Sequence, residues 1–422
     1  MSHRREQLQF AYTLYRDKAR FNFHGYVGRD PLCLANLTPG QRDPYPFYER
    51  IRARGPVSRS AAGVWASADY DVVRQVLRSR AMSSAPPEGQ QGADLSFLEM
   101  DPPDHTRLRR FALPSFSPRN LSSMDARITA ALNRLLDDLP TDEPFDLVSR
   151  VGAPMPITVI SDLLGVPDAD ADAFARYGST FGSALGGVRS LAHARRLVEA
   201  RTALGRIFEQ LFELKRREPG DDLITRAAEA GPEVIRPDEM APLLTLLLIA
   251  GFETTVNLIG NAVLALLEHP EQWELLVADP DRAGAVVEET LRYDSPVQRT
   301  GRRVVEPVTI GGHDFVADDF VVVCVAGANR DPSVYPEPAR FDITRTDPQE
   351  HLAFSGGIHY CVGAPLARLE ATIALRTLAQ RFPHLRRAGA LTRRPGSLIR
   401  GLQSFPVTVA PVVSRSTATA AA

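Results

Sequence analysis

The sequence has few cysteines, almost no lysines and no excess of basic charge, and these shortages exclude several classes of protein. The 422 residues include three cysteines, Cys33, Cys324 and Cys361, and no CxxC or HExxH pattern, so neither a disulfide framework nor a common zinc site is expected. The 49 Lys and Arg residues are balanced by 51 Asp and Glu residues, which argues against a nucleic-acid-binding protein. Only Lys18 and Lys215 are lysines, and we interpret this arginine bias as the mark of a GC-rich bacterial genome.

The N-terminal stretch lacks the features of a targeting segment. Residues 1–20 are amphipathic and charged and contain no uninterrupted apolar run, so they predict neither a signal peptide nor a membrane anchor. A reducing cytoplasm is therefore the expected location, without contact with a membrane. A monomer is the default expectation for the oligomeric state.

The pattern along the chain predicts a mainly α fold with a minor β region. Residues 1–40 have the character of a variable leader, and residues 414–422 that of a disordered tail. Between them, residues 41–413 show no clear linker, so we expect a single large helical domain with small sheets. A long Pro/Gly/Gln-rich loop at 83–99 interrupts this domain, and loops of this length are usually functional or disordered.

Helical and strand patterns occupy different parts of this domain. Helical patterns follow one another over 121–218, and a glycine-rich stretch at 178–187 predicts a mobile connection within them. Strand patterns gather at 302–327, with a turn at Gly311–Gly312, and again at 405–413.

The apolar run at 242–269 is long enough to cross a membrane, yet its polar residues argue against that reading. Glu253, Asn257 and Asn261 are spaced four apart and therefore share one helical face. A charge facing lipid is costly, so the run predicts a buried central helix of a globular protein.

The segment AGFETT within this run gathers the residue types of a proton-delivery site. Ala250 and Gly251 remove side-chain bulk, and Glu253 and Thr254 place an acid and a hydroxyl beside the gap. An acid and an alcohol next to a cavity can transfer protons. On these residues alone, proton delivery and an ordinary buried carboxylate with a structural threonine are equally supported.

A second motif surrounds one of the cysteines. Phe354, Gly357, His359, Cys361 and Gly363 form the pattern FxxGxHxCxG just before a predicted helix. Glycines let a backbone turn tightly around a flat object, and a thiolate near backbone amides and a helix N-terminus can bind a metal. A lone cysteine is usually a small buried hydrophobe, but five spaced positions indicate a binding loop instead.

Four separated segments together resemble the cytochrome P-450 family, the haem-thiolate monooxygenases, and specifically its soluble bacterial members. They are HTRLRR, AGFETT, EETLR and FSGGIHYCVG, and they occur in the family's order. The resemblance extends from about Asp43 to Val413. It implies the cytochrome P-450 fold for the domain at 41–413.

The resemblance also implies a cofactor, haem b (iron protoporphyrin IX), with Cys361 as the thiolate ligand of the iron. Two histidines and two arginines match the partners of the haem propionates, although Arg303 beside Arg302 leaves that assignment open by one residue. The other cofactor-binding positions implied by the motifs are His105, Arg109, Ala250, Gly251, Arg302, Phe354, Gly357, His359 and Gly363.

Two further groups of residues take roles from the resemblance. Glu253 and Thr254 match the acid–alcohol pair that guides protons during oxygen activation, so they are the predicted catalytic residues. Glu289 and Arg292 match the family's ExxR pair, with Arg340 as the third member of a buried structural charge network.

The inferred substrate pocket is apolar. By position it is lined by Leu95, Leu98, Leu246, Ile249, Val297, Leu398 and Ile399. An apolar lining without aromatic side chains favours a hydrophobic substrate of macrolide, terpenoid or polyketide size. Arg189 is the candidate anchor for a charged substrate group, and the segments 83–99 and 178–187 are candidates for opening and closing over the pocket.

The expected partners follow from what the chain does not carry. It contains no flavin or iron–sulfur segment and no GxGxxG after a strand, so the family implies O2 and electrons from a ferredoxin and its NAD(P)H-dependent reductase. Arg107 and Arg110 are candidates for an acidic partner's docking patch, and a solvated basic face is an equal alternative. The expected reaction is hydroxylation or epoxidation in bacterial natural-product biosynthesis or catabolism.

Three rival functions use the same scaffold. A peroxygenase would take peroxide in place of electrons, but such enzymes generally lack the acid–alcohol pair. An isomerase or coupling enzyme would need only part of the oxygen cycle. A haem-binding sensor or carrier would show no turnover, and the intact Glu253 and Thr254 argue against it without excluding it.

Overall fold

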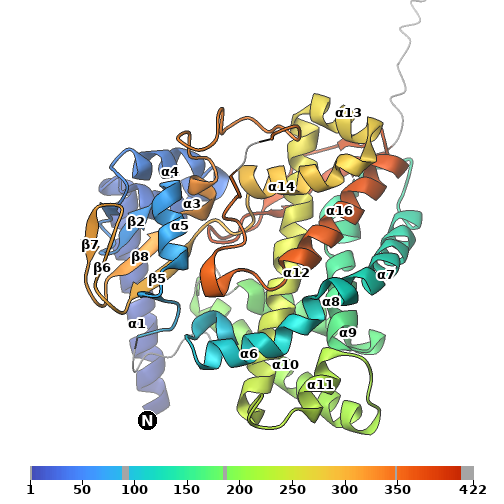
Figure 1. The fold of residues 1–422 in the computed structure, drawn as a ribbon, viewed down its shortest axis with the longest axis horizontal. Helices are drawn as coiled ribbons and strands as arrows, with labels where there is room; N and C mark the ends of the chain where they lie inside the picture. Colours follow the sequence, from blue (N-terminus) through green and yellow to red (C-terminus); the bar gives the residue numbers. More distant parts are fainter. Residues whose placement is uncertain (1, 88–94, 184–187, 347–348, 410–422) are drawn as a thin grey trace, which may run out of the picture.

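The computed structural model describes residues 2–87, 95–183, 188–346 and 349–409. It confirms the predicted fold class, since 59% of the chain is helical and the sheets are small (Figure 1). The expected disordered tail at 414–422 lies outside the described residues.

The helices differ widely in length, from single turns to one of 32 residues. The α-helices are α1 (Ser2–Asn22), α2 (Pro31–Asn36), α3 (Thr38–Arg42), α4 (Tyr45–Arg52), α5 (Tyr70–Arg78), α6 (Asp104–Ala112), α7 (Pro118–Asp137), α8 (Pro154–Leu164), α9 (Asp168–Gly182), α10 (Leu191–Arg217), α11 (Leu223–Glu229), α12 (Pro237–Glu268), α13 (Pro270–Ala278), α14 (Ala283–Tyr293), α15 (Val325–Ala328) and α16 (Ala364–Arg381). Short π turns lie at Phe23–Val27 and Val148–Gly152, and short 3-10 turns at Ser96–Glu99, Leu113–Phe116, Pro280–Arg282 and Gly357–His359.

The strands are short and, in the described part of the chain, form four separate sheets. They are β1 (Ser58–Arg59), β2 (Trp65–Ser67), β3 (Met82–Ser83), β4 (Phe145–Asp146), β5 (Thr300–Val304), β6 (Val308–Ile310), β7 (His313–Phe315), β8 (Phe320–Val323), β9 (Arg386–Arg387), β10 (Thr392–Arg393), β11 (Leu402–Ser404) and β12 (Pro406–Thr408). The largest sheet has the order β1-β2-β8-β5-β3, in which only β2 and β8 run parallel. The predicted turn at Gly311–Gly312 joins β6 and β7, and both glycines have the positive φ that this turn requires.

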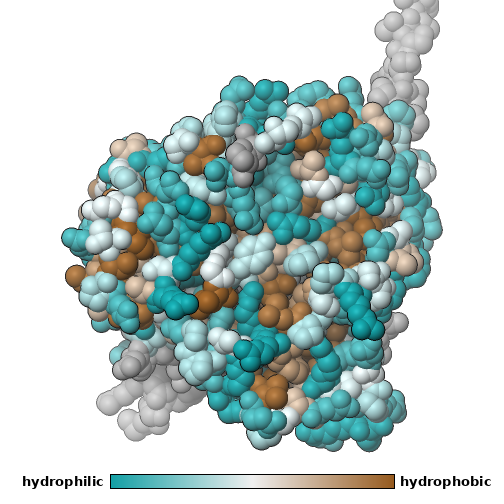
Figure 2. Space-filling model, viewed as in Figure 1, coloured by the Kyte–Doolittle hydropathy of each residue, from teal (hydrophilic) through white to brown (hydrophobic). Residues whose placement is uncertain are grey.

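Helix α12 is the centre of the molecule, as the apolar run predicts. Apolar side chains surround it on nearly all sides, and such a helix is stable only when other elements cover it. It passes the length and composition test for a membrane span, but 83% of that window is buried inside the protein. Helices α8, α9, α14 and α16 pack around it, and polar side chains cover most of the face seen in Figure 2.

Helices α1, α2 and most of α3 lie within residues 1–40, the predicted leader. One sequence expectation changes in the structure. The glycine-rich stretch is not a loop at its start, because α9 continues through Gly178 to Gly182. A Cβ on Gly178 would lie 3.0 Å from the Leu248 side chain, so this glycine permits close packing of α9 on α12. Residues 184–187 lie outside the described residues.

Candidate active site

Four basic side chains from three segments meet at one place. His105 and Arg109 lie one turn apart on α6, Arg302 comes from β5, and His359 comes from the loop before α16. The ring centroids of His105 and His359 are 4.5 Å apart, and burial, together with the charges of Arg302 and Arg109, lowers the pKa of His359. We call these four residues the basic cluster.

The basic cluster forms no ion pair with a carboxylate among the described residues, and Asp101 acts on His105 and Arg302 only as a nearby charge. Neither ring nitrogen of His105 nor Nε2 of His359 has a hydrogen-bond partner in the described part of the chain. Within the described residues Arg302 donates to Thr300 Oγ1 and to the Gly301 carbonyl, and burial lowers its pKa to about 10. Burying cations without anions is unfavourable, so the cluster is complementary to a ligand with two negative charges.

The two adjacent arginines of β5 have different surroundings. Arg303 forms an ion pair with Asp318 at 3.1 Å, on the other side of β5 from Arg302. Arg302 is 6% exposed and belongs to the basic cluster.

The loop before α16 is folded tightly around Cys361. The Cys361 amide donates to the Phe354 carbonyl at 2.9 Å, which closes the loop. Gly357 has φ +63°, and a Cβ there would lie 2.8 Å from the Leu77 carbonyl oxygen, so only glycine fits. Gly363 is the N-cap residue of α16, which places the thiol at the start of that helix.

The surroundings of Cys361 favour the neutral thiol in the chain alone, and its thiolate form requires a bound cation. Burial raises the pKa of the thiol, while the amides of Gly363 and Ala364 and the charge of Arg109 act in the opposite direction. The fold surrounds the thiol, yet the residue keeps accessible surface. A metal ion bound to the sulfur would keep the thiol deprotonated.

Helix α12 opens to the interior at the AGFETT segment. Ala250 is exposed although seven consecutive residues before it are buried, so the helix borders open space there. Thr254 donates its hydroxyl hydrogen to the Ala250 carbonyl at 2.7 Å, which leaves the oxygen lone pairs available. Gly251 faces a different neighbour, because a Cβ on it would lie 2.8 Å from Ile160 Cδ1 of α8.

Glu253 is buried and held by an arginine from the other end of the chain. Its side chain is 7% exposed, and Arg394 Nη1 lies 2.7 Å from its Oε1 atom. Oε2 has no hydrogen-bond partner among the described residues. Burial raises the pKa of Glu253, and the charge of Arg394 opposes this rise.

The predicted substrate residues separate into three groups. Val297 and Ile399 form a β-bridge. Beside it, the backbone amide of Gln298 donates to the Leu398 carbonyl at 2.9 Å. Leu95, Leu246 and Ile249 are buried in the main core, whereas Leu98 is 42% exposed. Arg189, the candidate substrate anchor, instead donates to the Pro395 carbonyl at 3.0 Å.

The ExxR pair forms as predicted, but its third member does not. Arg292 makes two hydrogen bonds of 2.8 Å to the carboxylate of Glu289. Arg340 contributes only its backbone carbonyl, while its side chain is 57% exposed and pairs with Glu337 and Asp342. Arg345 takes the third place, with Nε 3.2 Å from Glu289 Oε1.

The proposed docking arginines also differ from each other. Arg107 binds Glu239 and Asp104 with Nη2 contacts of 2.6 Å and donates to the Val234 carbonyl. It therefore ties α6 to the start of α12 and is unsuited to docking. Arg110 is exposed on the same helix and stays a candidate.

Sequence reasoning missed several contributors to this site. Arg368 of α16 stacks over Phe354 at 4.6 Å and donates to Glu288 Oε1 at 2.7 Å, which braces the cysteine loop. Arg345 and Arg394 were also missed, because their partners are distant in the sequence. The one available signal is chemical, since a buried carboxylate such as Glu253 requires a cation.

The comparisons with known proteins agree on one family. The family model described as "Cytochrome P-450" matches residues 282–390. The chain is 39% identical to the cytochrome P-450 monooxygenase PikC of Streptomyces venezuelae, over 86% of this chain and 91% of the relative. It is also 39% identical to the vitamin D(3) 25-hydroxylase of Pseudonocardia autotrophica, over 88% and 94%. The crystal structure of Mycobacterium smegmatis CYP164A2 superposes with a TM-score of 0.82 at 39% identity, over 87% of this chain and 96% of that one.

Proposed function

The chain belongs to the cytochrome P-450 family of haem-dependent monooxygenases, and we propose that it hydroxylates or epoxidises a hydrophobic small molecule with O2 and two electrons from a ferredoxin and its NAD(P)H-dependent reductase. The observation that carries this proposal is the basic cluster beside the cysteine loop. A natural-product or catabolic pathway in the cytoplasm is the proposed setting.

The residues present fit haem. His105 and Arg302 are buried and Arg109 and His359 are half-buried, and the ring nitrogens of the two histidines that lack a partner within the described residues suit the propionate carboxylates of the cofactor. We assign Cys361 as the thiolate ligand of the iron, with the amides of Gly363 and Ala364 donating to its sulfur. When bound, haem supplies oxygen activation and C–H oxidation, and the thiolate favours O–O cleavage.

The proton chemistry is assigned to this chain's own residues. Thr254 donates to the Ala250 carbonyl, so its oxygen can accept a hydrogen bond in the adjoining space and order a water molecule there. Glu253 immediately precedes Thr254 on α12 and is buried. Its Oε2 atom has no hydrogen-bond partner within the described residues. Oε2 is the atom at which we propose that the carboxylate takes up and releases protons.

Substrate orientation is assigned to Val297 and to Leu398 and Ile399 of the turn between β10 and β11. The Val297–Ile399 bridge and Leu398 give an apolar wall without a charged anchor, since Arg189 is engaged with Pro395. This favours a hydrophobic substrate, and the name of the vitamin D(3) 25-hydroxylase shows that a relative acts on such a molecule.

Oxygen labelling tests this proposal. The haem-loaded protein, a plant ferredoxin, its reductase and NADPH are incubated under 18O2 with a panel of hydrophobic molecules that includes vitamin D3. We expect a product that carries one labelled oxygen and depends on the reductase. Product formed equally well from hydrogen peroxide without reductase would instead establish a peroxygenase, and a rearranged product without label would establish an isomerase.

A further inference from the structure

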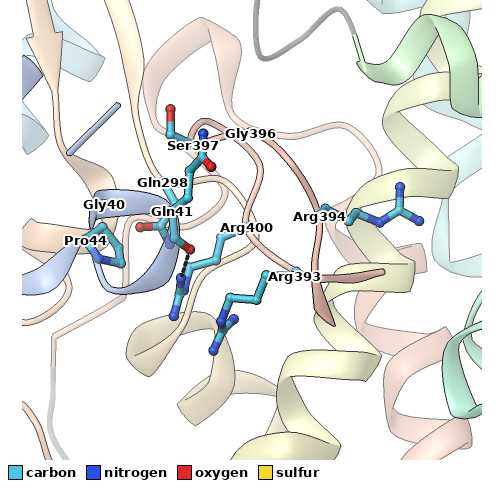
Figure 3. Close-up of a pocket in the computed structure, with 10 residues that line it drawn as sticks. Gly40, Gln41, Pro44, Gln298, Arg393, Arg394, Gly396, Ser397 and Arg400 are labelled. Carbon is cyan, nitrogen blue, oxygen red and sulfur yellow. Dashed lines mark hydrogen bonds between the residues drawn. The ribbon is translucent and has the colours of Figure 1, made fainter. Parts of the chain in front are cut away.

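The C-terminal segment 392–402 carries three arginines with different surroundings. Arg400 binds Asp294 at 2.7 Å, and Arg393 has a pKa lowered by burial and by Arg400. Arg394 turns away from both toward α12 (Figure 3). The small cavity between these residues has a volume of about 10 Å³, enough for one water, so it is no substrate site.

The guanidinium of Arg394 is fixed at several atoms. Its Nη1 donates to Glu253 Oε1 at 2.7 Å, and its Nε donates to the Leu402 carbonyl at 3.3 Å. Its backbone amide donates to the Gly401 carbonyl at 3.1 Å. The side chain is 20% exposed, so its ion pair with Glu253 is largely shielded from water.

The opposite side of Glu253 is shaped to keep its second oxygen in place. A Cβ on Gly182 at the end of α9 would lie 2.2 Å from Oε2, so this glycine makes room for the carboxylate. Arg189 adds a positive charge near Glu253 and donates to the Pro395 carbonyl, the residue after Arg394. Helix α12, the end of α9 and the C-terminal segment therefore meet at one carboxylate.

We propose that Arg394 is a positioning residue for Glu253: it holds Oε1 and aims Oε2 toward the proton path, and it links that acid to the turn carrying Leu398 and Ile399. This inference rests on the proposed role of Glu253 as a proton donor. Contact between a substrate and the turn then changes the position of the acid through Arg394, a route by which substrate binding controls proton delivery.

Removing the guanidinium should neutralise the acid. Without Arg394, burial acts on Glu253 with only the charge of Arg189 against it, so the pKa of this carboxyl should rise further and its protonated form should be favoured. The infrared difference spectrum of haem-loaded wild type minus Glu253→Gln should show an ionised carboxylate. The difference between Arg394→Gln and the double variant Arg394→Gln/Glu253→Gln should show a protonated carboxyl. The same subtraction for Arg394→Lys should show the ionised form again.

A double-mutant cycle gives the functional readout and needs no identified substrate. Hydrogen peroxide released per NADPH oxidised is measured with a plant ferredoxin and its reductase, without any organic substrate. Arg394→Gln and Glu253→Gln should each raise this ratio several-fold, and the double variant should match Glu253→Gln alone. Arg393→Gln is the matched control and should keep the wild-type ratio.

The outcomes separate the inference from the function on which it rests. A wild-type ratio in Arg394→Gln beside a raised ratio in Glu253→Gln would overturn only the positioning role. The positioning role would also be overturned if the two substitutions raised the peroxide ratio additively in the double variant. An ionised Glu253 carboxylate in Arg394→Gln would overturn it too. An unchanged ratio in Glu253→Gln would overturn the proton-donor assignment itself and the inference with it.

Discussion

Single residues at this site have opposite effects on folding and on cofactor binding. The buried bases of the basic cluster are unfavourable in the chain alone, because desolvation lowers the pKa of His105, His359 and Arg302. Two carboxylates at the same place would convert each of them into a hydrogen-bonded partner. Binding of haem and stability of the fold are therefore coupled through these side chains.

His105 makes this coupling measurable as a pH dependence. Burial and the charge of Arg109 lower its pKa in the folded chain below the ordinary 6.5. Below about pH 6.5 the unfolded chain therefore binds a proton that the folded chain does not, and stability falls as pH falls. Urea unfolding of the haem-free protein between about pH 7 and about pH 5 should show this loss, and His105→Phe should reduce it. Equal slopes in both proteins would contradict the account.

Thr254 gives a second prediction at the residue scale. Thr254→Ala should keep haem and substrate binding but lower product formed per NADPH by about tenfold or more, because a positioned proton donor is lost. Thr254→Ser keeps the hydroxyl that now donates to the Ala250 carbonyl, and it should retain most of the wild-type yield. The measurement is product and hydrogen peroxide per NADPH, and an unchanged yield in Thr254→Ala would remove this residue from the proton path.

Among the helices and turns, the sequence predicts best those whose structure follows from their own local residue pattern. The apolar run at 242–269 and the turn at Gly311–Gly312 follow from local chemistry, and both are confirmed. The glycines of α9 mislead for a physical reason. Glycine breaks helices in water, but Gly178 has Leu248 of α12 directly above it, and close packing of two helices stabilises what propensity opposes.

The charge network around α14 shows where local patterns end. Glu289 and Arg292 are three apart on one helix, so their pairing is predictable from spacing. The partner of Glu289 from the following segment is Arg345, not the expected Arg340, and only the folded path of that segment decides between them.

Substitutions in this network test the corrected assignment. Arg292→Ala leaves the buried Glu289 without its main partner and should cost about 3–5 kcal/mol of the free energy of unfolding. Arg345→Ala should destabilise by about 1–3 kcal/mol, whereas Arg340→Ala at an exposed position should stay within about 0.5 kcal/mol. Urea unfolding followed by circular dichroism measures all three, and a larger loss for Arg340→Ala than for Arg345→Ala would refute the assignment.

For the whole molecule, the sequence motifs predict which distant segments share a site. The α6 residues, Arg302 of β5 and His359 of the cysteine loop lie together although they are far apart in the chain, so the basic cluster forms from the expected residues. What the motifs could not give are long-range contacts made by single side chains, such as Arg394 with Glu253 across 141 positions. Such contacts depend on the packing of the C-terminal segment and have no periodic signal.

The face that carries α6 gives a prediction about the redox partner. Arg107 is engaged with Glu239, so Arg110 is the arginine of this helix that is exposed for an acidic ferredoxin. Arg110→Glu should raise the KM for ferredoxin several-fold at low salt with little change in kcat, and added salt should reduce the difference. Steady-state reduction kinetics at two salt concentrations provide the measurement. An unchanged KM would place the docking surface elsewhere.

The central claim is that Cys361 binds the haem iron as a thiolate, and the carbon monoxide difference spectrum of the reduced, purified protein tests it most directly. We predict the strongly red-shifted Soret band of a thiolate-ligated haem, lost in Cys361→Ala and kept in Cys33→Ala. A band typical of histidine- or thiol-ligated haem, or an unaltered spectrum in Cys361→Ala, would contradict the assignment of the cysteine loop as the iron-binding site.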